Sequence, residues 1–104
     1  MDARYRIHLT SEAISDFEAI ARYLRARSPQ NAAAFADVLL NAIYSLQSMP
    51  YRFKIVANSR RRRTAVHSMV VQPYLVYYRV TDNPARVFIL KIVHGARRQP
   101  RRFH

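Results

Sequence analysis

The sequence predicts an α+β fold with the element order strand, helix, helix, strand, strand, strand. In this fold a helical hairpin packs on one face of a mostly antiparallel four-stranded sheet. Three observations predict it. Apolar and polar residues alternate over 5–9, as in a strand with one buried face. Two helical patterns follow over 11–27 and 29–49, and segments rich in β-branched and aromatic residues occupy most of 64–94.

The two helices are predicted from their caps and their apolar spacing. Thr10 or Ser11 can cap the first helix, which should end near Arg27. Ser28-Pro29 both ends this helix and starts the next, because the residue before proline is pushed out of the α region. The second helix should end at Met49-Pro50. So short a join predicts an antiparallel hairpin. The apolar stripes are Ile14, Phe17, Ile20, Ala21 and Leu24, then Phe35, Leu39, Ala42, Ile43 and Leu46.

The remaining strands are separated by turn residues. Residues 51–63 have no clear period and end in four consecutive arginines, which predicts a loop. The last strand is apolar on both faces at its centre, which favours an interior position in the sheet. Strands are predicted over 64–71, 74–80 and 86–94, with turns at Gln72-Pro73 and over 81–84.

The alternation in the last two strands predicts which side chains face away from the helices. We expect the faces that carry Lys91 and Arg79 to form an open, partly apolar and cationic surface. Such a surface suits the docking of a partner. The residues sharing these faces are Val87, Ile89, Lys91 and Val93 in the last strand, and Leu75, Tyr77 and Arg79 in the strand before it.

The second half of the chain carries the whole of its net charge. The formal net charge is +12, and residues 1–50 balance five arginines against five acids, whereas Asp82 is the single acid of 51–104. Because arginine pairs bidentately with phosphate and carboxylate, the bias predicts an anionic partner; a solvated basic face is the alternative. The candidate contact residues are Arg60, Arg61, Arg62, Arg63, Arg79, Lys91, Arg97 and Arg98.

Length and composition predict one domain over 1–104, with 96–104 a basic tail. The absence of cysteine argues against a disulfide scaffold and favours a reducing cytoplasm. The longest apolar run is far shorter than the roughly 20 residues that cross a bilayer, and no secretory pattern begins the chain. The four histidines lack metal-ligand spacing, and no phosphate loop or nucleophile motif occurs, so we predict no metal and no cofactor.

An ordered set of motifs runs through nearly the whole chain. It ends in His94-Gly95-Ala96-Arg97, and together the motifs resemble the RelE/ParE superfamily of toxins from bacterial type II toxin–antitoxin pairs, particularly its ParE-like branch. The resemblance implies a small cytoplasmic toxin that an acidic antitoxin wraps and silences in a hetero-oligomer. The earlier motifs are Ser11, Ala13, Asp16, Ile20 and Tyr23; Ser28-Pro29, Ala32, Phe35, Leu39, Ile43 and Leu46; Met49-Pro50; Tyr74, Val76 and Tyr78-Arg79-Val80; and Val87, Ile89, Leu90 and Ile92.

The resemblance implies two alternative activities. ParE-like members poison DNA gyrase without cutting nucleic acid, and this chain departs from their pattern because Arg98 stands where an acid is common. RelE-like members are ribosome-dependent mRNA endonucleases; here Arg79, Arg97 and Arg98 could hold phosphate and His94 could shuttle a proton. No tyrosine follows Tyr78 to act as a base, and His94 fits a structural role equally well. We therefore favour the gyrase inhibitor and leave an enzymatic role open.

Overall fold

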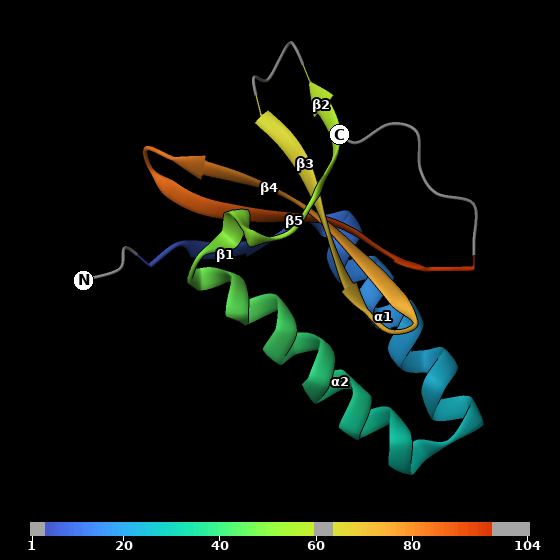
Figure 1. Cartoon of the computed structure of the whole chain (residues 1–104). Helices are drawn as coiled ribbons and strands as arrows, with labels where there is room; N and C mark the ends of the chain where they lie inside the picture. Colours follow the sequence, from blue (N-terminus) through green and yellow to red (C-terminus); the bar gives the residue numbers. More distant parts are fainter. Residues whose placement is uncertain (1–3, 60–63, 97–104) are drawn as a thin grey trace.

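The computed structural model describes residues 4–59 and 64–96 of the chain. Figure 1 shows a strongly twisted sheet with the two helices below it, which confirms the predicted α+β fold. The elements are β1 (Arg6–Leu9), α1 (Ser11–Arg27), α2 (Pro29–Tyr44), the 3₁₀ helices η1 (Ser45–Gln47) and η2 (Pro50–Arg52), β2 (Ile55–Ser59), β3 (Thr64–Val71), β4 (Tyr74–Asp82) and β5 (Ala85–His94).

The sheet has five strands in the order β1-β5-β4-β3-β2, so the expectation of four strands is wrong. The additional strand is β2, which lies in the segment predicted to be a loop and pairs antiparallel with β3. Ile55 and Val56 are 55% and 42% exposed at this edge, so no buried alternating face marks the strand in the sequence. β1 pairs parallel with β5, and β5 lies inside the sheet as predicted.

The helix boundaries follow local signals. The Thr10 hydroxyl accepts a hydrogen bond from the Ala13 amide at 3.2 Å, so α1 begins where its cap was predicted. Ser28 separates the two helices, as expected. α2 ends at Tyr44 and tightens into η1, before the predicted end at Met49, whose φ of 50° is left-handed. In the described part of the chain, neither helix is long and apolar enough to cross a membrane.

The main apolar core lies between the helical hairpin and the sheet. Leu39 and Ile43 of α2 are fully buried there, as is Tyr78 of β4. The Tyr78 hydroxyl donates to the carbonyl oxygen of Pro50 at 2.7 Å, which ties η2 to the centre of the sheet. Burial raises the pKa of Tyr78 to about 12. This tyrosine therefore stays neutral and structural.

The other face of the sheet carries a smaller apolar cluster. Val66, Tyr77 and Leu90 are buried in it, and among the described residues it consists of strand side chains alone. Arg79 pairs with Val66 and so lies on this face, as predicted. It is only 6% exposed, however, so its guanidinium is not an open cationic contact.

An irregularity in β5 changes the pattern of faces. Tyr77 pairs with Lys91 and Tyr78 pairs with Ile89, so Leu90 is an extra residue between them. Ile92 consequently packs in the core under the helices. The prediction that Val87, Ile89, Lys91 and Val93 share one face is therefore wrong, because Val87 and Ile89 lie in the helix-side core and Val93 packs on the opposite cluster.

Candidate functional site at the end of strand β5

Helix α1 closes the outer edge of β5 beyond the end of β1. β1 pairs only with residues 86–89 of β5. Past this point the Thr10 amide and hydroxyl donate to the carbonyl oxygen of Ile89 at 3.1 and 2.8 Å. The Asp16 carboxylate then accepts a hydrogen bond from the Ile92 amide at 3.0 Å. These bonds occupy strand groups that a neighbouring strand would otherwise pair, and they fix α1 to the strand end.

An ion pair lies beside these hydrogen bonds. The Lys91 ammonium is 2.7 Å from a carboxylate oxygen of Glu12, and the Glu12 side chain is 46% exposed. At such exposure an ion pair contributes little to stability, about 0–1 kcal/mol. Its effect is to orient Lys91 toward α1 rather than toward solvent above the open face.

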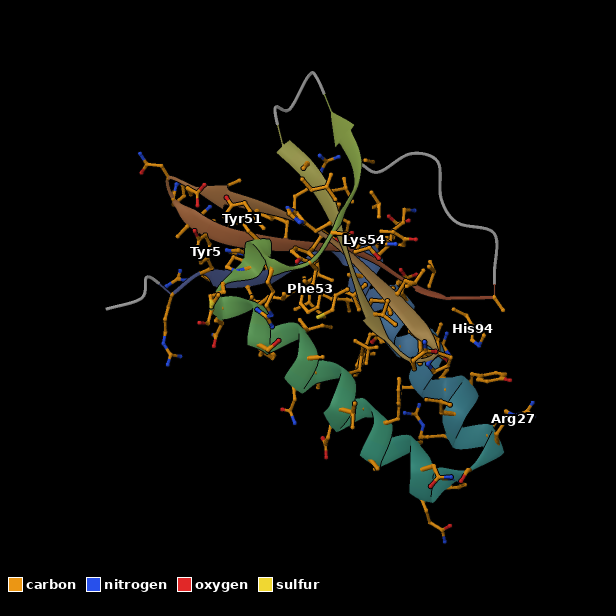
Figure 2. The ribbon with its side chains drawn as sticks, in the orientation of Figure 1. Tyr5, Arg27, Tyr51, Phe53, Lys54 and His94 are labelled. Atoms are coloured by element: carbon orange, nitrogen blue, oxygen red, sulfur yellow. The ribbon has the colours of Figure 1, made fainter. Side chains whose placement is uncertain are left out.

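A cavity of about 260 Å³ lies between α1 and the end of β5. We call it the His94 pocket. Figure 2 shows His94 at the same end of the molecule as Arg27, whose guanidinium carbon lies 5.3 Å from the centre of the Tyr23 ring. The pocket combines apolar walls with one carboxylate and one imidazole, which suits an apolar side chain flanked by polar groups. Its lining residues are Asp16, Ala19, Ile20, Tyr23, Tyr74, Ile92, Val93 and His94.

One contact determines the tautomer of the neutral His94 ring. Its Nδ1 accepts a hydrogen bond from the Ala96 amide at 3.0 Å. In the neutral ring the hydrogen is therefore on Nε2, which acts as a donor. The ring also packs edge-on against Tyr74, with centroids 5.4 Å apart, and Tyr74 packs on Phe35 of α2. The contacts of His94 thus serve a structural role and leave one N–H donor.

Gly95 sets the point from which the C-terminal arginines start. Its amide donates to the carbonyl oxygen of Pro73 at 2.7 Å, and a Cβ placed on Gly95 would lie 3.1 Å from that oxygen. This approach is tighter than a side chain normally allows, so glycine, the only one in the sequence, fits here best. The chain therefore leaves β5 beside the turn between β3 and β4.

Asp16 has an unusual environment for a carboxylate. Burial raises its pKa above the ordinary value, and the nearby Glu12 adds to this effect. The hydrogen bond from the Ile92 amide and the charge of Lys91 act in the opposite direction but do not outweigh burial. The ionised form is therefore less favourable in the folded chain than in the unfolded one.

This environment predicts opposite effects for two substitutions of Asp16. Asn can still accept from the Ile92 amide, so D16N should be at least as stable as the native chain at pH 7. D16A leaves that amide unpaired and should lose about 1–3 kcal/mol. The pKa of Asp16 is higher in the folded chain than in the unfolded chain. The native chain therefore loses stability relative to D16N as pH rises from the unfolded pKa of Asp16 through its folded pKa. Urea unfolding of the three proteins between pH 3 and pH 8 measures these stabilities, and a difference between the native chain and D16N that does not change with pH would contradict the prediction.

The structure does not bring together in one place those predicted site residues that it describes. His94 lines the pocket, Lys91 pairs with Glu12, and Arg79 is buried on the opposite sheet face. The arginines at 60–63, 97 and 98 lie outside the described residues. Among the residues described, no three histidine, aspartate or glutamate side chains group to hold a metal ion.

Sequence reasoning missed the contribution of α1 to the pocket. Asp16, Ala19, Ile20 and Tyr23 all come from this helix. The available signal was the match of Asp16, Ile20 and Tyr23 to the family helix. Their spacing of three and four residues puts them on one side of the helix, and this side faces the end of β5.

The chain matches a family of toxins in sequence and shares its fold with chains of solved toxin–antitoxin systems. A family model described as the ParE toxin of the type II toxin–antitoxin system parDE matches residues 7–99. A search of curated proteins gave no significant match.

Three solved structures share the fold. A chain of the chromosomal ParDE system from P. aeruginosa is 18% identical, with a TM-score of 0.69, and the alignment covers 88% of this chain and 97% of that one. A chain of the RelBE2 toxin–antitoxin complex from Mycobacterium tuberculosis is 25% identical, with a TM-score of 0.59 and coverage of 93% and 100%. A chain of the archaeal RelE–RelB complex from Pyrococcus horikoshii OT3 is 15% identical, with a TM-score of 0.66 and coverage of 91% and 99%.

Proposed function

Because the chain belongs to the family of ParE toxins of type II toxin–antitoxin systems, we propose that it inhibits DNA gyrase and that a cognate acidic antitoxin neutralises it. In this proposal residues 1–104 act as one toxin domain in the cytoplasm, and toxin and antitoxin form a hetero-oligomer. The family match over residues 7–99 is the observation that carries the proposal. The net charge of +12 supports an acidic partner through charge complementarity.

The chemistry of the described residues supports binding rather than cleavage. A ribonuclease needs a base, an acid and cations that reach one phosphate. Tyr74, Tyr77 and Tyr78 are all at most 5% exposed, and Arg79 is 6% exposed. A phosphodiester outside the sheet therefore does not reach these groups.

We propose that the target contacts the end of β5. The His94 pocket supplies an apolar cavity there, and Arg97 and Arg98 follow Ala96 directly in the sequence. An apolar anchor with acidic neighbours on the partner would complement this combination.

One observation favours the alternative of a RelE-like, ribosome-dependent mRNA endonuclease. The Ala96 amide fixes the neutral His94 ring with a hydrogen on Nε2, so the ring can donate a hydrogen bond to the negative charge that develops on a phosphate or leaving oxygen. In this alternative Arg97 and Arg98 would hold the phosphate.

Induced expression without the antitoxin is expected to arrest growth, with DNA-damage signalling and trapped gyrase cleavage complexes before protein synthesis falls. The reason is that a poison of cleavage complexes damages DNA first and affects translation later. Complex trapping on plasmid DNA with purified gyrase measures the effect directly.

Co-expression of the acidic protein from a neighbouring reading frame serves as the control and should restore growth. Immediate translation arrest with mRNA cut at the ribosomal A site would instead establish the RelE-like alternative. Normal growth at confirmed soluble expression would contradict both activities.

A further inference from the structure

A second cavity lies at the opposite end of β4 from the His94 pocket. It has a volume of about 360 Å³, and we call it the Asp82 pocket. Tyr74 at the start of β4 lines one cavity and Asp82 at its end lines the other, eight residues or about 26 Å apart. Figure 2 shows Tyr5 and Tyr51 together at this end, away from His94. The Asp82 pocket is lined by Tyr51, Ile55, Ala65, His67, Val80, Thr81, Asp82 and Asn83.

Asp82 is the only acid in residues 51–104, yet no cation of the described chain pairs with it. Its two carboxylate oxygens instead accept hydrogen bonds from the hydroxyls of Tyr5 and Tyr51, each at 2.5 Å. The hydrogen bonds from Tyr5 and then Tyr51 lower the pKa of Asp82, so the carboxylate is ionised at neutral pH. Two neutral donors leave its negative charge uncompensated.

Three polar side chains that line the cavity, those of Tyr51, Thr81 and His67, direct a hydrogen to an acceptor of the protein itself. The Tyr51 hydroxyl donates to Asp82, and the Thr81 hydroxyl donates to the carbonyl oxygen of Pro84 at 2.7 Å. His67 Nδ1 lies 2.9 Å from the carbonyl oxygen of Phe53, which can only accept, so the neutral ring keeps its lone pair on Nε2. These groups, together with further lone pairs on the Asp82 oxygens, are acceptors. A ligand that fits them brings several N–H donors and a positive charge.

The apolar part of the cavity narrows the choice of ligand. Tyr51 is 49% exposed and lines one wall, and Ile55 and Val80 supply aliphatic surface. A guanidinium is planar, carries five donors, stacks on aromatic rings and sits on an apolar stem. The volume is at the low end for ligand pockets and suits a single side chain rather than a nucleotide cofactor.

We propose that the Asp82 pocket binds an arginine side chain of a partner polypeptide, with the guanidinium against the Asp82 carboxylate and the Tyr51 ring. This site is separate from the His94 pocket and does not depend on whether gyrase or the ribosome is the target. The Asp82 pocket would thus bind a basic group of the partner, whereas the other charged contacts proposed for this chain bind acidic groups.

The test is a titration of the isotopically labelled full chain with three short peptides, followed by the backbone amide signals of Ala65, Thr81 and Asn83. The peptides differ in one central residue: arginine, lysine or citrulline, which has the shape of arginine without its charge. The arginine peptide should shift these signals to saturation, with affinity at least about tenfold higher than for citrulline and higher than for lysine. Equal affinity for arginine and citrulline would overturn the proposal, and this comparison needs no variant.

Variants distinguish arginine binding by Asp82 from a purely structural role of its hydrogen bonds with Tyr5 and Tyr51. D82N should weaken arginine binding about tenfold, whereas D37N, which removes the same charge from the exposed surface of α2, should not. Y51F keeps the carboxylate and the ring and should still bind the arginine peptide. Unchanged arginine affinity in D82N, even with a lowered melting temperature, would overturn the proposal and leave Asp82 a structural residue.

Discussion

Replacing Arg97 and Arg98 together by alanine is expected to relieve growth arrest and to reduce gyrase complex trapping by at least about tenfold. Two charged contacts with a partner, each contributing about 1 kcal/mol or more, produce a loss of this size. Because arginine is almost never fully buried unless paired, and substitution of charged side chains outside a core changes stability little, the melting temperature should stay within about 4 °C of the native value. Growth curves, trapping assays and thermal unfolding on the same variant measure the three quantities.

The matched control removes the same charge farther along the chain. R101A combined with R102A also lowers the net charge by two but leaves the residues that follow His94-Gly95-Ala96 unchanged. We expect this variant to keep most of the activity. Equal loss in both double variants would show that total charge, and not the place directly after His94-Gly95-Ala96 in the sequence, determines toxicity.

Leu39→Ala is expected to have the largest effect on stability. Leu39 is fully buried between α2 and the sheet, and truncation of such a leucine costs about 3 kcal/mol through lost burial and a residual cavity. This is a large part of the roughly 5–15 kcal/mol that stabilises a typical protein. For a chain of this length the melting temperature should fall by roughly 12–24 °C.

Val38→Ala is the matched control for this prediction. Val38 precedes Leu39 on the same helix, but its side chain is 53% exposed. Its truncation should change stability by no more than about 0.5 kcal/mol. Similar losses in the two variants, measured by urea and thermal unfolding, would contradict the assignment of Leu39 to the core between hairpin and sheet.

The helical hairpin could be predicted from the sequence because its signals are local. A cap at Thr10, the Ser28-Pro29 join and two apolar stripes each act within a few residues. The same holds for the turns at Gln72-Pro73 and before Ala85. The end of α2 was less predictable, since tightening into η1 keeps almost the same spacing of apolar side chains.

The sheet could be predicted only in part, because strand pairing depends on distant residues. Ile55 and Val56 are exposed on an edge strand and give no alternation, so β2 was missed. The extra residue Leu90 moves Ile92 to the helix side, and only the pairing with β4 shows it. For the site, His94 followed from the motif, but the Asp16 contact to Ile92 joins residues 76 positions apart.

The closure of β5 by α1 also limits how copies of this chain can join edge to edge. Thr10 and Asp16 occupy backbone groups at one border of the sheet, whereas the outer border of β2 is unpaired within residues 4–59 and 64–96. Two molecules that met through β2 would present to a third only the four residues of β1 and the part of β5 that α1 closes. Growth into a fibre needs two open borders on every subunit, so a border this short disfavours further stacking.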